Sequence, residues 1–248
     1  MTPARHLAHF REVMLAVIAA LAKALGQLFD PAVLLVLVKT VAVTVLVFVA
    51  LGVGLYYALI WIGTEFSVSS TGMAEAAAAT LTALLASWLL FRIVALAVMQ
   101  LFADEIVAAV EKRHYPEAAA TAKALPLHRD IANSLQGAGR ALLFNALALP
   151  IAGLLLFTAI GPAVVFLLIN AVLLGRELTD MAWLRHCDGD VKGNPVSGME
   201  RVLLGGAIAG VMLVPFANLL APVIGAAAGT HLMHGVRAKR ANGEQTDA

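Results

Sequence analysis

A small set of charged and amide side chains lies within, or at the ends of, the long apolar runs of this sequence. The set comprises Arg92, Glu105, Arg140, Asn145, Asn170, Arg176, Glu177, Arg201 and Asn218. Guanidinium and amide groups carry several N–H donors, so they can replace the water shell of a hydrated oxyanion. Charged groups at membrane depth are expensive and usually functional. We therefore predict a path for an anion, lined by such groups.

The residue types predict two roles within this set. We expect Arg92, Arg140, Arg176 and Asn218 to contact the anion, and Glu105, Glu177 and Arg201 to form a charge network that shapes the path. The alternative for Arg140, Arg176 and Arg201 is simple anchoring at the membrane interface. Arg92 lies well inside its apolar run, so its partner should come from another segment.

Prolines interrupt the apolar runs in the second half of the chain, and we expect helix breaks at Pro162, Pro215 and Pro222. Proline removes a backbone donor, and lipid offers no replacement for the lost hydrogen bond. A break is tolerated where protein surrounds it or where it lines a watery cavity. It also exposes helix N-termini, which attract anions. The alternative is a packing kink satisfied by neighbouring helices.

The composition excludes several functional classes. Apolar residues make up 61% of the 248 residues and charged residues only 13%, with a mean hydropathy of +0.88, so the solvent of this chain is a lipid bilayer. A net charge of +1 gives no reason to expect nucleic acid as a partner. Phosphate-loop and nucleophile-elbow motifs are absent from the sequence, and we expect neither enzyme activity nor a cofactor.

Cysteine and histidine usage argues against a metal centre. The single cysteine, Cys187, excludes an intramolecular disulfide and any cluster of several cysteines. His231 and His234 can share a helix face, and His186 stands next to Cys187 and Asp188. We interpret these histidines as interfacial side chains and expect no metal site.

The first half of the chain predicts an interfacial helix followed by two long helices. Residues 4–28 have one apolar and one polar face, which favours a helix lying in the membrane interface over a signal peptide. Residues 32–63 carry a single charge, Lys39, and are long enough to cross a bilayer. Residues 74–115 predict a second long helix that ends at Pro116.

The second half predicts two helical hairpins, at residues 141–186 and 198–240, within a single membrane domain that covers residues 1–248. Residues 141–160 are apolar, but the apolar runs before Gly175 and from Val202 to Val214 hold only twelve and thirteen residues. These runs fall short of the roughly twenty residues that a span needs, so the hairpins are expected to cross the bilayer only in part. Loop 64–75 lacks Lys and Arg, whereas every other polar segment is basic, which predicts cytoplasmic termini. Six full spans satisfy the same charge pattern.

Three segments resemble corresponding parts of a known family. They read LFADEIVAAVEKRHYP, LLGRELTDMAWLRH and VPFANLLAPVIGAAAGTHL. These segments are similar to those of the CysZ family of bacterial sulfate permeases, which belongs with the etoposide-induced-protein-like membrane proteins. The resemblance covers roughly residues 10–236, in order.

This resemblance implies an all-α integral membrane protein of the bacterial inner membrane that admits sulfate for cysteine biosynthesis. It implies two long transmembrane helices with partly inserted hairpins, assembled as a homo-oligomer in the lipid bilayer. Family members often carry arginines just after the proline that begins the first long helix. Ala32, Val33, Leu34 and Leu35 occupy those positions here, so no sulfate site is expected there. A membrane scaffold without transport activity is the alternative function.

Overall fold

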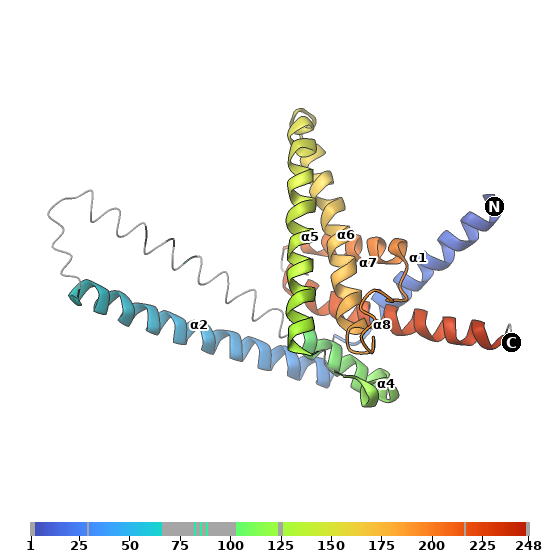
Figure 1. Cartoon of the computed structure of the whole chain (residues 1–248), viewed down its shortest axis with the longest axis horizontal. Helices are drawn as coiled ribbons and strands as arrows, with labels where there is room; N and C mark the ends of the chain where they lie inside the picture. Colours follow the sequence, from blue (N-terminus) through green and yellow to red (C-terminus); the bar gives the residue numbers. More distant parts are fainter. Residues whose placement is uncertain are drawn as a thin grey trace. The chain divides into compact units, whose positions relative to one another are not determined.

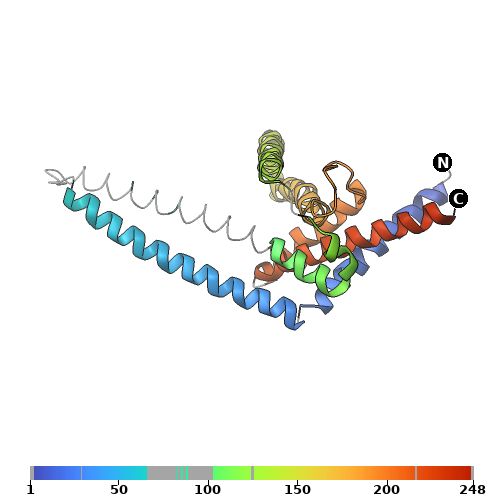
Figure 2. The same ribbon diagram turned by 60° about the horizontal axis from the view of Figure 1, so that its bottom comes forward.

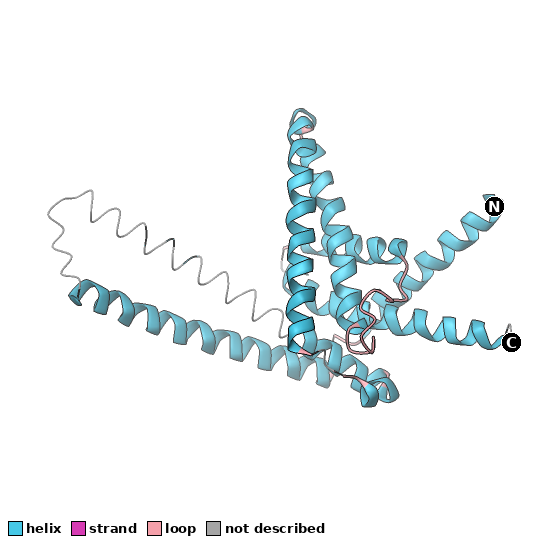
Figure 3. Ribbon diagram, in the orientation of Figure 1, coloured by secondary structure: helices cyan, strands magenta, loops and turns pink. Residues whose placement is uncertain are grey.

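The computed structural model describes residues 3–28, 30–65, 82, 85, 88, 103–123, 126–215 and 217–246. Helices dominate these residues, and no strand occurs among them (Figures 1 and 3). The labelled elements are α1 (Pro3–Gly26), α2 (Pro31–Glu65), α4 (Pro116–Thr121), α5 (Leu127–Leu154), the 3-10 turn η1 (Leu156–Thr158), α6 (Gly161–Trp183), α7 (Gly198–Met212) and α8 (Ala217–Thr246). The prediction of an all-α protein is confirmed.

The chain divides into two compact units. One comprises residues 34–102, and the other comprises residues 1–33 and 103–248. Helix α2 confirms the long helix expected at 32–63 and begins with Pro31 at its first position, where the missing N–H has no helical acceptor. Of the second long helix expected at 74–115, residues 103–114 are helical and end before Pro116, while much of its first part lies outside the described residues.

Helices α5 and α6 form an antiparallel hairpin, seen side by side in Figures 1 and 2. Its tip consists of η1 and the residues before Pro162, which stands in the first turn of α6. Helix α5 begins at Leu127, ahead of residue 141, where the first hairpin was expected to begin. Two stretches, Leu135–Leu154 and Gly161–Trp183, are long and apolar enough to cross a membrane. Whether the hairpin crosses fully stays a prediction.

The surface of this hairpin is the kind that lipid covers. Large apolar side chains point outward along both helices and over the tip, where Phe157 is 97% exposed. They include Leu142, Leu143, Leu147, Leu149, Ile151, Leu154, Leu156, Ile160, Val164 and Leu168. An exposed apolar surface of this extent indicates a membrane or a partner.

Helices α7 and α8 form the second hairpin, with the break between Leu213 and residue 216 that Pro215 was expected to cause. The N-terminus of α7 carries a capping box: the Ser197 hydroxyl accepts from the Glu200 N–H, and the Glu200 carboxylate accepts from the Ser197 N–H. The prediction of a helix break at Pro222 is wrong, because α8 continues through it. Pro222 lies near the start of α8, where a single backbone hydrogen bond is lost.

Helix α1 confirms the helix expected at 4–28. It packs along α8 (Figure 2), and its buried residues are mostly small, such as Ala20 and Ala24. Phe10 and Met14 are exposed, whereas Gln27 is buried. Short side chains let helix backbones approach closely, and the place of α1 in the membrane interface stays a prediction.

Candidate functional site

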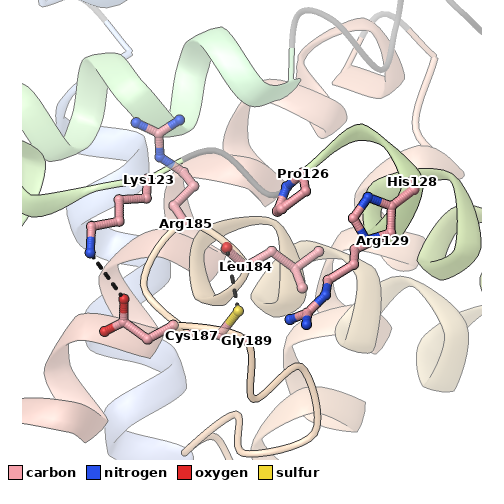
Figure 4. Close-up of a pocket in the computed structure, with 9 residues that line it drawn as sticks. Lys123, Pro126, His128, Arg129, Leu184, Arg185, Cys187 and Gly189 are labelled. Atoms are coloured by element: carbon pink, nitrogen blue, oxygen red, sulfur yellow. Dashed lines mark hydrogen bonds and ion pairs between the residues drawn. The ribbon is translucent and has the colours of Figure 1, made fainter.

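A basic pocket lies at the polar end of the α5–α6 hairpin, where α6 ends and α5 begins (Figure 4). Its volume is about 400 Å³. It is lined by Lys123, Pro126, His128, Arg129, Leu184, Arg185, Cys187, Asp188 and Gly189. Lysine and two arginines surround this space with a single carboxylate, so the pocket favours an anion.

Local backbone chemistry shapes the pocket. Asp188 and Gly189 both have positive φ values, 43° and 101°, and the Asp190 N–H donates to the Cys187 carbonyl, which closes a tight Asp-Gly turn. The Arg129 guanidinium lies so close to the Gly189 Cα that a side chain there would displace it. Lys123 pairs with Asp188 at 3.4 Å on the exposed rim (Figure 4).

A buried polar cluster lies beside this pocket and shares Arg185 with it. Glu111, in the helix of residues 103–114, is completely buried. Its Oε2 accepts from Arg185 Nε at 2.9 Å. Its Oε1 lies 2.7 Å from His186 Nε2 and 3.2 Å from His234 Nε2. Burial raises the pKa of Glu111, but the hydrogen bonds from His186, His234 and Arg185 outweigh it and lower the pKa to about 2.

A second buried chain of hydrogen bonds continues from this cluster. Tyr115 Oη lies 2.8 Å from His231 Nδ1, and His231 Nε2 lies 3.1 Å from Gln27 Oε1. The Tyr115 ring stacks on His234 with centroids 4.3 Å apart. Burial, followed by the positive charges of nearby groups, lowers the pKa of His231 to about 4. The histidine is therefore neutral at pH 7, which suits a tyrosine hydroxyl that donates to it.

Arg176 and Arg201 are brought together by the close crossing of α6 and α7, and both have local partners. Arg176 Nε lies 3.2 Å from Asp180 Oδ2, one helical turn on. Arg201 Nε donates to the Val196 carbonyl at 3.0 Å, and its terminal nitrogen donates to the Asn194 carbonyl at 3.3 Å. Asn194 Nδ2 in turn donates to Asp180 Oδ1 at 2.7 Å. These contacts hold the loop between α6 and α7 in place.

The other predicted site residues are not gathered into this region by any described contact. Arg140 is half-buried on α5, and Asn218 is exposed in the first turn of α8. Glu105 is half-buried and Glu177 exposed, and each has an interaction partner. Asn145 and Asn170 donate to carbonyls of their own helices. Arg92 lies outside the described residues. The roles assigned to these residues stay predictions.

We did not predict from the sequence the buried polar residues that the fold brings closest together. Glu111, Arg185 and the imidazoles of His186 and His234 come from three separate segments. A local signal existed for part of the set, because Arg185 and His186 adjoin a Cys-Asp-Gly-Asp run. No short-range sequence pattern connects that run to Glu111, which resembles any charged residue on the polar face of an amphipathic helix.

Comparison with known protein families identifies the family of this chain. Residues 20–222 match the family described as sulfate transporter CysZ/etoposide-induced protein 2.4. The chain belongs to this family. No curated protein and no solved structure matches it. For a member of the CysZ/etoposide-induced family, two helices capable of crossing a membrane and a basic pocket at their shared end suit a transporter-like role.

Proposed function

We propose that this protein is a sulfate permease of the bacterial inner membrane, supplying sulfate to the cytoplasm for cysteine biosynthesis. The observation that carries the proposal is the basic pocket at the polar end of the α5–α6 hairpin. Membership of a family described by sulfate transport supports the choice of anion.

The charges around the pocket favour a dianion. Arg129 and Arg185 offer planar sets of N–H donors that match an oxyanion, and Lys123 adds a point charge. Arg185 is already paired with Glu111, so Arg129 carries the main share of anion binding. The basic rim supports a cytoplasmic position for this pocket and for both chain termini, in line with the positive-inside rule.

The proposed path of sulfate through the membrane is channel-like. Entry of two negative charges against an inside-negative potential costs roughly 4.6 kcal/mol per 100 mV. Uptake is therefore driven by the sulfate gradient that metabolic consumption maintains, or by a coupled cation. The outward faces of α5 and α6 are apolar, so a water-filled path needs further surfaces, which a homo-oligomer in the bilayer provides. Arg92, Arg140, Arg176 and Asn218 are proposed contacts along it.

Uptake of radiolabelled sulfate into proteoliposomes tests the proposal directly. The purified protein should admit sulfate without ATP, and Arg129→Gln should reduce the initial rate about tenfold, as expected for loss of a charge-assisted hydrogen bond. Lys192→Gln removes an exposed positive charge from the same polar region without touching the pocket, and it should leave the rate unchanged. Flux no higher than that of empty liposomes would reject permeation by this chain.

A membrane scaffold is the second candidate, and helix α1 favours it. Leu7, Leu15 and Ile18 are exposed on a helix that packs on α8 through its other side, which suits a role at the lipid surface. Deletion of the gene separates the two functions. Loss of a sulfate permease should slow growth on limiting sulfate and be rescued by cysteine, whereas loss of a scaffold should give no sulfur requirement.

A further inference from the structure

Three side chains from distant parts of the chain converge on one buried point. Glu111 lies in the helix of residues 103–114, His186 in the turn after α6, and His234 in α8. Their side chains are 0%, 2% and 6% exposed. One potential ligand atom from each lies within 4.8 Å of the others. Both imidazoles present Nε2 to the same carboxylate oxygen, so the three donors surround a common centre.

We propose that Glu111, His186 and His234 form a binding site for a divalent transition-metal ion of the zinc type. Two imidazole nitrogens and one carboxylate oxygen form a ligand set that zinc takes, with a fourth position for water. Bonds of about 2.0–2.1 Å in a tetrahedral site place neighbouring ligand atoms about 3.3 Å apart. The Glu111–His234 separation of 3.2 Å already has this value, and the Glu111–His186 pair at 2.7 Å needs a small opening. Magnesium and calcium prefer oxygen ligands and fit less well.

The surroundings of the three ligands hold them in orientation. Arg185 Nε binds the second oxygen of Glu111 at 2.9 Å and leaves the first oxygen facing the histidines. The His234 ring is stacked on Tyr115, and the His186 ring meets it edge-on with centroids 5.2 Å apart. Outer contacts of this kind fix carboxylate and imidazole ligands around metals. Besides the small opening of the Glu111–His186 pair, metal binding requires that each imidazole carry its proton on Nδ1 rather than Nε2.

A cavity lies next to the site on the side of His186. Its volume is about 400 Å³, and it is lined by His186 and Arg185 together with Ala120, Thr121, Ala122, Lys123, Asp188 and Arg237. Because the His186 side chain is only 2% exposed, entry of an ion from this cavity requires a local movement of that side chain. Bound metal would join the end of the 103–114 helix, the turn after α6 and helix α8, and the site is therefore structural in this proposal.

Metal content of the full-length protein tests the inference. The protein is purified in detergent with its affinity tag removed, stripped with EDTA, incubated with zinc chloride and desalted before mass-spectrometric metal analysis. We expect close to one zinc ion per chain, at least a fivefold loss in His186→Ala and His234→Ala, and no loss in His128→Ala, which removes an exposed histidine outside the cluster. Zinc content that is far below stoichiometry in the wild type, or unchanged in both cluster variants, overturns the proposal.

Two measurements on the wild-type protein test the proposal without relying on variants that fail to fold. Cobalt chloride added to the stripped protein should produce the strong visible absorption of four-coordinate Co²⁺, and zinc should abolish it. Zinc should also raise the midpoint of thermal unfolding, and EDTA should reverse the rise. Absence of both effects overturns the proposal. Neither measurement depends on sulfate flux, so the metal-binding proposal and the permease proposal are tested separately.

Discussion

A side-chain carbon on Gly175 would overlap the backbone carbonyl of Arg201, because α6 and α7 cross in direct backbone contact at this point. In the same way, a side-chain carbon on Gly205 would overlap the backbone carbonyl of Ala171. These contacts position Arg176 and Arg201 next to each other, and they fix the loop that both helices share.

Gly175→Ala should destabilise the protein by at least 1–3 kcal/mol, because a backbone carbonyl cannot move aside as a flexible side chain can. Gly210→Ala, in the crossing helix α7, is the control, since nothing lies within 4 Å of the added carbon there. It should stabilise α7 by about 0.5–1 kcal/mol. Thermal unfolding in detergent compares the two, and equal midpoints for both variants would contradict the close crossing.

Ser197→Ala should lower stability by about 1 kcal/mol, because the capping box at the start of α7 loses the acceptor for the Glu200 N–H. Ser197→Asp keeps an acceptor at the helix N-terminus and should restore most of the loss. The two variants are compared by the midpoint of thermal unfolding. A destabilised Asp variant would show that the hydroxyl serves some purpose other than capping.

Loss of Arg185 should be severe because it leaves Glu111 buried with one cationic partner fewer. Arg185→Leu is expected to destabilise the metal-free protein by about 3–5 kcal/mol. The double variant Arg185→Leu with Glu111→Leu should recover much of this, since no unpaired charge is left. The pair Lys123–Asp188, in which both side chains are about four-fifths exposed, serves as the control and should change stability by less than about 1 kcal/mol when broken.

Acid should destabilise the metal-free protein through His231. Its pKa is about 4 in the folded protein and near 6.5 in the unfolded chain, so between these values the unfolded chain binds the extra proton. Stability is fully present above pH 6.5 and declines as the pH falls toward 4. At pH 5 the loss is about 2 kcal/mol.

Thermal unfolding at pH 7 and pH 5, with EDTA present, checks this dependence. His231→Gln cannot take up a proton and should show a smaller drop between the two pH values than the wild type does. Identical drops would mean that other groups carry the acid sensitivity.

Phe157→Trp reports how deeply the α5–α6 hairpin enters the bilayer. Phe157 stands at the tip and is almost fully exposed, so the substitution should leave stability unchanged. If the hairpin inserts in part, lipids brominated near the bilayer centre should quench the tryptophan strongly. Quenching from the far headgroup region would instead favour a full crossing, and quenching by aqueous iodide alone would place the tip in water.

Local sequence features predicted much of the helical framework. Proline and apolar run lengths located the start of α2 and the breaks that separate α5 from α6 and α7 from α8. They failed at Pro222, which lies inside α8. The error arises because a proline near the start of a helix costs a single backbone hydrogen bond and need not end the helix.

The candidate sites were harder to predict because they are assembled over long distances. Glu111 and His234 are 123 residues apart in the sequence yet meet at 3.2 Å. The pocket arginine, Arg129, was not among the predicted site residues; it lies in the first turn of α5, and its guanidinium lies next to Gly189. Only tertiary packing brings such residues together, so no local pattern contains the information.

The packing of α1 on α8 reverses the arrangement familiar from water-soluble proteins. The buried residues of α1 are mostly alanine and valine, such as Val17, Ala20 and Ala24, while Leu7 and Phe10 face outward. The hydrophobic effect contributes little to the stability of this helix pair, because its largest apolar side chains are not buried against protein. The pair therefore depends on close packing of small side chains and on the lipid or detergent that covers the outward leucines. The surrounding lipid is thus a structural component, and short-chain detergents should loosen this helix pair before any bond within it is strained.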